Sequence, residues 1–179
     1  TFRIHASSFF QPNVAQAEKI FQTVTEWAQL KGNEKIFDLY TGVGTIALFL
    51  AKHGAEDVLG IEGNAQAIED ATFNAKLNHV ENARFMTGDI LETFNSAFLE
   101  KQGYPDIIVL DPPRSGTLIE IKKTINASGA KKVIYLSCNP VSLAFDLKQL
   151  TEVYRVTRMQ PFDMLPHTHH LETLVLLER

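Results

Sequence analysis

The chain has 179 residues, of which 45% are hydrophobic and 21% charged, and its formal net charge is −4. This length suits one domain that buries a core without disulfides or a metal, and no apolar run approaches the roughly 20 residues that cross a bilayer. The acidic balance argues against a stand-alone nucleic-acid binder, because such proteins usually present a concentrated basic face.

The hydrophobic pattern predicts alternating helices and strands. Residues 13–30 have the apolar spacing of an amphipathic helix. Five buried strands are then predicted in KIFDLY (35–40), DVLGIE (57–62), ARFMTG (83–88), DIIVLD (106–111) and KVIYLS (132–137). Intervening helices are expected after Gly44, Asn64, Ile90, Gly116 and Pro140. This order predicts an α/β fold, with an open, mostly parallel, Rossmann-like sheet and helices on both faces.

The end of the chain departs from this alternation. EVYRVTRMQPFD (152–163) and LETLVLLER (171–179) look like two strands joined without a helix. They predict an antiparallel edge pair, which makes seven strands in all. In sheets of this kind, ligands bind at the carboxyl ends of the strands, near the point where the strand order reverses.

A glycine loop follows the first predicted strand. FDLYTGVGTIA places Gly42 and Gly44 before a helix, where glycine lets the backbone approach a ligand and the helix N-terminus offers free N–H groups. Glu62 ends the second strand, where a carboxylate can accept both hydroxyls of a ribose. Asp89 ends the third strand, where it can reach an adenine amino group. The loop therefore predicts a nucleotide-containing cofactor.

Two cofactors fit this loop. A nicotinamide-binding unit shares the glycines and the acidic residue. Asp38 before the loop and Asp89 after the third strand favour S-adenosylmethionine. Ala47 stands in place of the third glycine of the dinucleotide pattern, although that pattern tolerates alanine. We therefore expect S-adenosyl-L-methionine as the cofactor.

Three later motifs place reactive side chains at or beside strand tips. LDPPRSG contains Asp111, LSCNP contains Cys138, and PHTHHLETL contains Glu172. Methylation of uracil carbon 5 needs a thiolate that adds to carbon 6, a polar group that holds the enol oxygen or ring nitrogen, and a base that removes the carbon-5 proton. These three residues can fill those roles. The thiol needs a lowered pKa, which the following helix N-terminus can help to provide.

Other side chains leave alternatives open. Histidines 167, 169 and 170 are a weak metal motif, so loop or supporting roles are favoured and no metal is expected. A histidine also remains an alternative base, because its ordinary pKa suits proton transfer. Arg114 can either neutralise a phosphate or pair with Asp111.

These motifs resemble the RNA 5-methyluridine methyltransferase family, whose members act on carbon 5 of uracil in ribosomal or transfer RNA. The resemblance rests on SFFQPN (8–13), DLYTGVGTIAL (38–48), GIEGNAQAIEDATFNAKLN (60–78), LDPPRSG, SCNP and the run that ends at Glu172. It implies the class I S-adenosylmethionine-dependent methyltransferase fold. RNA cytosine-C5 enzymes carry a cysteine after the proline of the DPP-like motif, where this chain has Pro113–Arg114, which favours uridine.

The resemblance also implies roles for individual residues. Cys138 would be the nucleophile and Glu172 the general base. The pocket for the cofactor and the uracil would be lined by Gln11, Tyr40, Thr45, Glu62, Asp89 and Asp111. The implied function is transfer of a methyl group to a specific uridine of ribosomal or transfer RNA.

The resemblance also bears on the domain organisation of the protein and its binding to RNA. Family members carry an N-terminal oligonucleotide-binding-type domain and a central RNA-binding region, and this chain begins at Thr1 without them. We therefore expect residues 1–179 to be the catalytic domain of a longer protein and to bind RNA weakly alone, with no membrane partner. A single cysteine excludes an internal disulfide and favours a reducing, cytoplasmic setting.

Two other functions remain possible for this fold. Methylation of an amino nitrogen through the proline-containing loop would give Cys138 no role. A non-catalytic RNA-binding scaffold would tolerate loss of cofactor binding.

Overall fold

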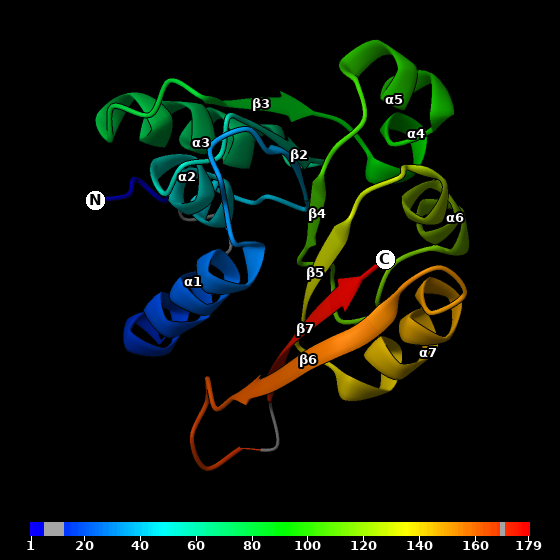
Figure 1. Ribbon diagram of the computed structural model, residues 1–179. Coiled ribbons are helices and arrows are strands. Elements are labelled where there is room, and N and C mark those ends of the chain that lie inside the picture. Colours follow the sequence, from blue (N-terminus) through cyan, green and yellow to red (C-terminus); the bar gives the residue numbers. More distant parts are fainter. Residues whose placement is uncertain (6–12, 169–170) are drawn as a thin grey trace.

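The computed structural model describes residues 1–5, 13–168 and 171–179, so the predicted site residue Gln11 and two of the three histidines lie outside the described residues (Figure 1). Its elements are α1 (Val14–Ala28), β1 (Lys35–Leu39), α2 (Thr45–Lys52), β2 (Asp57–Glu62), α3 (Ala65–Leu77), β3 (Ala83–Thr87), α4 (Ile90–Thr93), α5 (Ser96–Gln102), β4 (Ile107–Leu110), α6 (Ile119–Ala127), β5 (Lys132–Ser137), α7 (Pro140–Leu150), β6 (Arg155–Phe162) and β7 (Glu172–Glu178). The alternation of strands and helices predicted from the sequence is confirmed.

The strands form one seven-stranded sheet with the order β3-β2-β1-β4-β5-β7-β6. The first five strands of the chain pair in parallel, whereas β7 is antiparallel to both β5 and β6. The antiparallel pair is confirmed, but only β6 lies at the edge, because β7 is inserted between β5 and β6. The strand order reverses between β1 and β4, which makes this the expected ligand-binding position.

Alternating residues of each strand enter two separate cores. Ile36 of β1 packs on the side of α1 and α2, whereas Phe37 and Leu39 pack on the side of α4 to α7. Figure 1 shows α1, α2 and α3 on one face of the sheet and α4 to α7 on the other. The central strands are buried on both faces, which explains their nearly continuous apolar runs.

Side-chain caps determine where several helices begin. Asn13 caps α1, and its side-chain oxygen accepts a hydrogen bond from the Gln16 backbone N–H at 3.2 Å. The single helix expected after Ile90 is instead two short helices, because Asn95 interrupts it and caps α5 through the Phe98 N–H at 3.0 Å. In the described ranges, no helix is long and apolar enough to cross a membrane.

Candidate active site

The predicted site residues meet at the carboxyl edge of the sheet, on both sides of the switch in strand order. Leu39 of β1 pairs with Ile61 of β2 and with Leu110 of β4. The residues that follow these three are Tyr40, Glu62 and Asp111. One row across three neighbouring strands therefore presents a phenol and two carboxyl groups.

Cys138 and Glu172 are brought together by the antiparallel pair of β5 and β7. Ser137 at the end of β5 pairs with Thr173 of β7 in an antiparallel register. Cys138 directly follows Ser137 and Glu172 directly precedes Thr173, so this pair brings the two residues to the same end of the sheet, where both line one cavity. Because β7 runs antiparallel, its beginning rather than its end lies at the carboxyl edge of the sheet.

The three predicted catalytic side chains also share one face of the sheet. Each lies two positions along its strand from a core residue of the α1 side, and side chains in a strand alternate between faces. Asp111, Cys138 and Glu172 therefore point toward α1 and α2. They are directed into the same space rather than to opposite sides of the sheet.

That space is a cavity of about 380 Å³, within the size range of small-molecule sites. It is lined by Phe21, Tyr40, Thr41, Gly42, Val43, Thr45, Ile46, Glu62, Asp111, Pro112, Pro113, Arg114, Cys138 and Glu172. The cavity thus brings together the glycine loop, the proline-containing loop, the cysteine and the second acid. Phe21 belongs to the apolar face of α1, so the sequence pattern alone indicated only a core residue.

The glycine loop has the backbone conformation that its sequence predicts. Gly44 begins α2 in the left-handed region at φ 81°, and a Cβ there would lie 2.9 Å from the Phe85 ring. The Gly42 N–H donates to Glu62 Oε2 at 3.2 Å, and the Asn64 N–H donates to Oε1 at 2.9 Å. These bonds hold the carboxylate in place at the end of β2.

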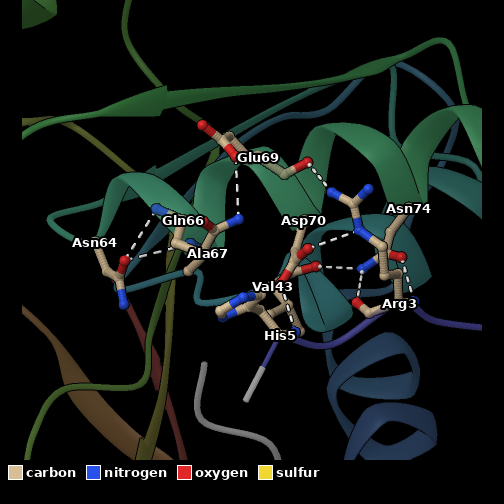
Figure 2. Close-up of polar contacts among 9 residues, drawn as sticks. All are labelled: Arg3, His5, Val43, Asn64, Gln66, Ala67, Glu69, Asp70 and Asn74. Atoms are coloured by element: carbon tan, nitrogen blue, oxygen red, sulfur yellow. Dashed lines mark hydrogen bonds and ion pairs between the residues drawn. The ribbon is translucent and has the colours of Figure 1, made fainter. Parts of the chain in front are cut away.

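Helix α3 supports this loop from behind (Figure 2). The buried Asn74 side chain donates to the Val43 carbonyl at 3.2 Å and to the Arg3 carbonyl at 2.9 Å. Asp70 accepts from Arg3 Nε and from the His5 backbone N–H, both at 2.8 Å. One face of α3 therefore fixes both the glycine loop and residues 1–5.

Two of the acids predicted to bind the cofactor have local structural partners. Asp38 is buried beneath the loop, where it accepts from the Thr41 hydroxyl at 2.5 Å, and burial raises its pKa to about 7. Thr41 itself lines the cavity, so Asp38 reaches the site through this residue. Asp89 is exposed and caps α4 through the Leu91 N–H at 2.8 Å. It is not among the lining residues, and its contact with adenine stays a prediction.

Tyr40 has an unusual backbone for a bulky residue. Its φ is 65°, a conformation that tends to persist only where the surroundings enforce it. Its hydroxyl lies 3.0 Å from Thr117 Oγ1, and burial raises its pKa. The strained residue is thus held at the cavity wall by a contact with the loop that follows β4.

Burial and mutual repulsion favour protonation of the acidic groups in the cavity. The Asp111 pKa is well above its usual range because of burial and the nearby charges of Glu172, Asp38 and Glu62. Burial likewise raises the Glu172 pKa, and its Oε2 is buried without a hydrogen-bond partner among the described residues. These are the environments in which a carboxyl group can exchange protons near neutral pH.

The pKa of the Cys138 thiol is raised, contrary to the sequence-based expectation that the helix N-terminus lowers it. Burial is the main cause, followed by the charges of Glu172 and Asp111. Arg114 opposes this shift, but its effect is the smaller one. This shift favours the neutral thiol over the thiolate, and a cation that enters the cavity would oppose it.

No group of three potential metal ligands occurs within the ranges that the structure describes. His167 is exposed, in a loop before β7, with φ 68°. It does not line the cavity.

Comparison with known proteins defines the class and then the family. The fold matches a crystal structure of Pyrococcus abyssi tRNA (uracil-54, C5)-methyltransferase in complex with S-adenosyl-L-homocysteine, with a TM-score of 0.85 and 36% identity over 98% of this chain and 41% of that one. The fold is that of the class I S-adenosylmethionine-dependent methyltransferases. The family model described as tRNA (Uracil-5-)-methyltransferase matches residues 1–179, and the chain belongs to this family.

Two bacterial relatives match nearly the whole of this chain. An uncharacterized RNA methyltransferase of Bacteroides thetaiotaomicron is 44% identical over 99% of this chain, and one of Porphyromonas gingivalis is 43% identical over 99%. The chain spans 39% and 38% of these two proteins, respectively. The matched region is therefore less than half of each relative.

Proposed function

We propose that this chain is the catalytic domain of an S-adenosylmethionine-dependent RNA methyltransferase that modifies carbon 5 of a uridine in ribosomal or transfer RNA through a covalent cysteine adduct. The observation that carries the proposal is the meeting of Cys138, Glu172 and Asp111 in one cavity beside the glycine loop. A tRNA uracil methyltransferase with the same fold over 98% of the chain supports it.

The chemistry of the cavity fits S-adenosylmethionine. Glu62 is held by two backbone N–H groups and retains lone pairs that can accept ribose hydroxyls. Burial, followed by the nearby charges of Glu172, Asp38 and Glu62, raises the pKa of Asp111, and a sulfonium or ammonium cation in the cavity would oppose this shift. Gly42, Thr45 and Tyr40 would form the remaining wall. When bound, this cofactor supplies an electrophilic methyl group.

The chain's own residues would first act on carbon 6 of the uracil. The Cys138 thiol first loses its proton to solvent. The thiolate sulfur then forms a bond to this carbon, while the π electron pair of the C5–C6 double bond moves into the enolate of carbons 4 and 5. In its protonated form, which burial and neighbouring charges favour by raising its pKa, Asp111 is suited to donate a hydrogen bond to this enolate.

Glu172 would complete the reaction after carbon 5 has gained the methyl group. Its carboxylate accepts the carbon-5 proton, the C–H electron pair restores the double bond between carbons 5 and 6, and the Cys138 thiolate leaves. A carboxyl with a raised pKa is a stronger base than an ordinary glutamate. Its position in the same cavity as Cys138 puts base and leaving group beside the same ring. The target base would be flipped out of its stack to reach them.

Trapping with 5-fluorouridine tests this function. Fluorine cannot be removed as a proton, so incubation with S-adenosylmethionine and a short RNA containing 5-fluorouridine is expected to leave a covalent complex, measured by intact-protein mass. Cys138→Ser is expected to abolish it. Retention of the complex in Cys138→Ser, or its absence in the wild-type chain and in a longer protein that contains it, would contradict the covalent reaction.

Ordinary uridine RNA identifies the base in the same experiment. Glu172→Gln keeps the size of the side chain but cannot accept the carbon-5 proton. We expect this variant to accumulate a methylated adduct on ordinary uridine that the wild type releases. Normal turnover by Glu172→Gln would assign the base elsewhere, and normal methylation by Cys138→Ser would favour methylation of an amino nitrogen.

A further inference from the structure

The 111–117 loop, which carries Asp111 into the cavity, is fastened to the helix that begins just after Cys138. Asn139 caps α7 by accepting from the Val141 N–H at 3.1 Å, and its amide donates to the Arg114 carbonyl at 3.1 Å. The Ser142 hydroxyl lies 3.1 Å from the same carbonyl and 3.1 Å from the Asn139 carbonyl, so its one proton is shared. The residue next to the nucleophile therefore holds the loop.

A second attachment lies one turn further along α7. Asp146 Oδ2 accepts from the Thr117 backbone N–H at 2.9 Å and from the Tyr135 hydroxyl at 2.5 Å. Asp146 Oδ1 accepts from Lys122 Nζ at 2.6 Å. All these groups are buried, so the carboxylate is fixed from three directions. It is a rigid anchor for the end of the loop.

The loop itself is shaped to fit against α7. The Gly116 N–H donates to the Pro113 carbonyl at 2.8 Å, which closes a turn. Gly116 has φ +82°, and a Cβ there would lie 2.5 Å from Asp146 Oδ2. Thr117 also contacts the Tyr40 hydroxyl at 3.0 Å. Contacts from α7 thus reach the loop that follows β4, and Thr117 of that loop in turn contacts Tyr40, which follows β1.

We propose that Asn139 and Asp146 are positioning residues that hold the 111–117 loop in a fixed place relative to Cys138, an inference that rests on the function proposed above. Neither side chain lines the cavity. Their effect is to keep Asp111 where the enolate would form when the thiolate adds. Misplacement of such a group by about 1 Å can lower a rate by about 100-fold.

Asn139→Ser tests the first attachment. Serine retains the helix cap but removes the amide that donates to Arg114. Asn95→Ser is the matched control, because Asn95 caps α5 and donates its amide to the Glu92 carbonyl at 2.9 Å, outside the cavity. Asn139→Ser is expected to slow formation of the 5-fluorouridine adduct by about 10- to 100-fold at saturating S-adenosylmethionine. Asn95→Ser is expected to stay within about twofold of the wild type.

Gly116→Ala tests the second attachment, because its added methyl group would displace the turn from Asp146. It is expected to slow adduct formation in the same way, at a cofactor affinity within about twofold of the wild type. Adduct rates equal to that of Asn95→Ser in both variants would overturn the inference.

A second readout does not depend on RNA methylation. Cys138 is the chain's only cysteine, so its alkylation by iodoacetamide at different pH values reports its thiol pKa. Glu172 on β7 and Asp111 and Arg114 on the loop are the charged groups that act on it, and burial and the acids outweigh the arginine. A loosened loop admits water and moves Asp111 away.

The alkylation midpoint is therefore expected at lower pH in Asn139→Ser and Gly116→Ala than in the wild type or Asn95→Ser. An unchanged midpoint in both loop variants would overturn the positioning role. If neither the wild-type chain nor a longer protein that contains it forms an adduct, the proposed function fails, and the alkylation profiles still decide whether the loop is held beside Cys138.

Discussion

At the scale of single residues, the main feature is the number of carboxyl groups whose proton affinity changes on folding. Asp38, Asp111 and Glu172 all have raised pKa values, with burial as the largest cause. Such a group binds its proton more tightly in the folded chain than in the unfolded chain. Its contribution to stability is therefore fully present at low pH and is lost as the pH rises through the folded pKa.

Asp38→Asn tests this linkage. With a folded pKa of about 7 and an ordinary value of 3.8, Asp38 should cost the wild type about 2–3 kcal/mol of unfolding free energy between pH 5 and pH 8. Asparagine carries no charge and keeps an oxygen for the Thr41 hydroxyl. We expect urea unfolding to show this loss in the wild type and a decrease smaller by that amount in Asp38→Asn. Equal decreases in the two proteins would show that the Asp38 pKa does not change on folding.

Local sequence signals predicted most of the residues that meet in the cavity but not the direction of their pKa shifts. Asp111, Cys138 and Glu172 follow or begin recognisable strands, so their meeting at one edge could be inferred from strand ends. The raised pKa of Cys138 could not, because it depends on how two acids from other strands surround the thiol. The participation of Phe21 depends on where α1 packs, and a helical periodicity does not specify that position.

At the scale of elements, the loop between β1 and α2 depends on close packing as well as on backbone freedom. A Cβ at Gly44 would lie 2.9 Å from the Phe85 ring and 3.0 Å from the Ala71 Cβ. Gly54, at the end of the same helix, also has a positive φ, but nothing lies within 4 Å of the Cβ that would be added there. An alanine at either position adopts an unfavourable positive φ, but only an alanine at position 44 also overlaps neighbouring side chains. Comparing the two variants therefore distinguishes the cost of overlap from the cost of backbone strain.

We expect Gly44→Ala to lower the unfolding free energy by about 1–3 kcal/mol more than Gly54→Ala does, because only the first overpacks its surroundings. The measurement is urea unfolding of both variants at one pH. We also expect S-adenosylmethionine to raise the melting temperature of Gly54→Ala but to have a smaller effect on Gly44→Ala. Equal losses of stability would mean that Phe85 moves aside without cost.

Element order was easier to predict than element termini. The five parallel strands follow from buried apolar runs, and their alternation with helices implies the two-faced sheet. Asn95 divides the helix expected after Ile90, because a local side-chain cap there competes with continuation of the helix. The insertion of β7 between β5 and β6 depends on long-range pairing, which the two apolar runs do not encode.

At the scale of the whole molecule, charge and length bear on RNA binding. The net charge is −4, and the chain spans 39% of the relative from Bacteroides thetaiotaomicron. Binding to a phosphate backbone depends on clustered cations and weakens with added salt. The acidic chain is therefore poorly suited to supply most of the RNA affinity.

We expect the 179-residue chain to bind ribosomal or transfer RNA with a dissociation constant weaker than about 10⁻⁵ M at physiological salt. Its affinity for S-adenosylmethionine should be retained, since the cavity is formed within the chain. Fluorescence titration of labelled RNA and calorimetry of the cofactor check the two parts. Tight, site-selective RNA binding by this chain alone would contradict the first.

The insertion of β7 has a consequence for folding order. In the sheet, β6 has only β7 as a neighbour, although β6 is synthesised first. Its native pairing must wait until β7 is available. Glu172 begins β7, so the proposed base reaches the site with the strand that joins β6 to the sheet. A nascent chain in which β5 is still an edge strand would hold the cysteine without its base, so turnover would begin only when the sheet is complete.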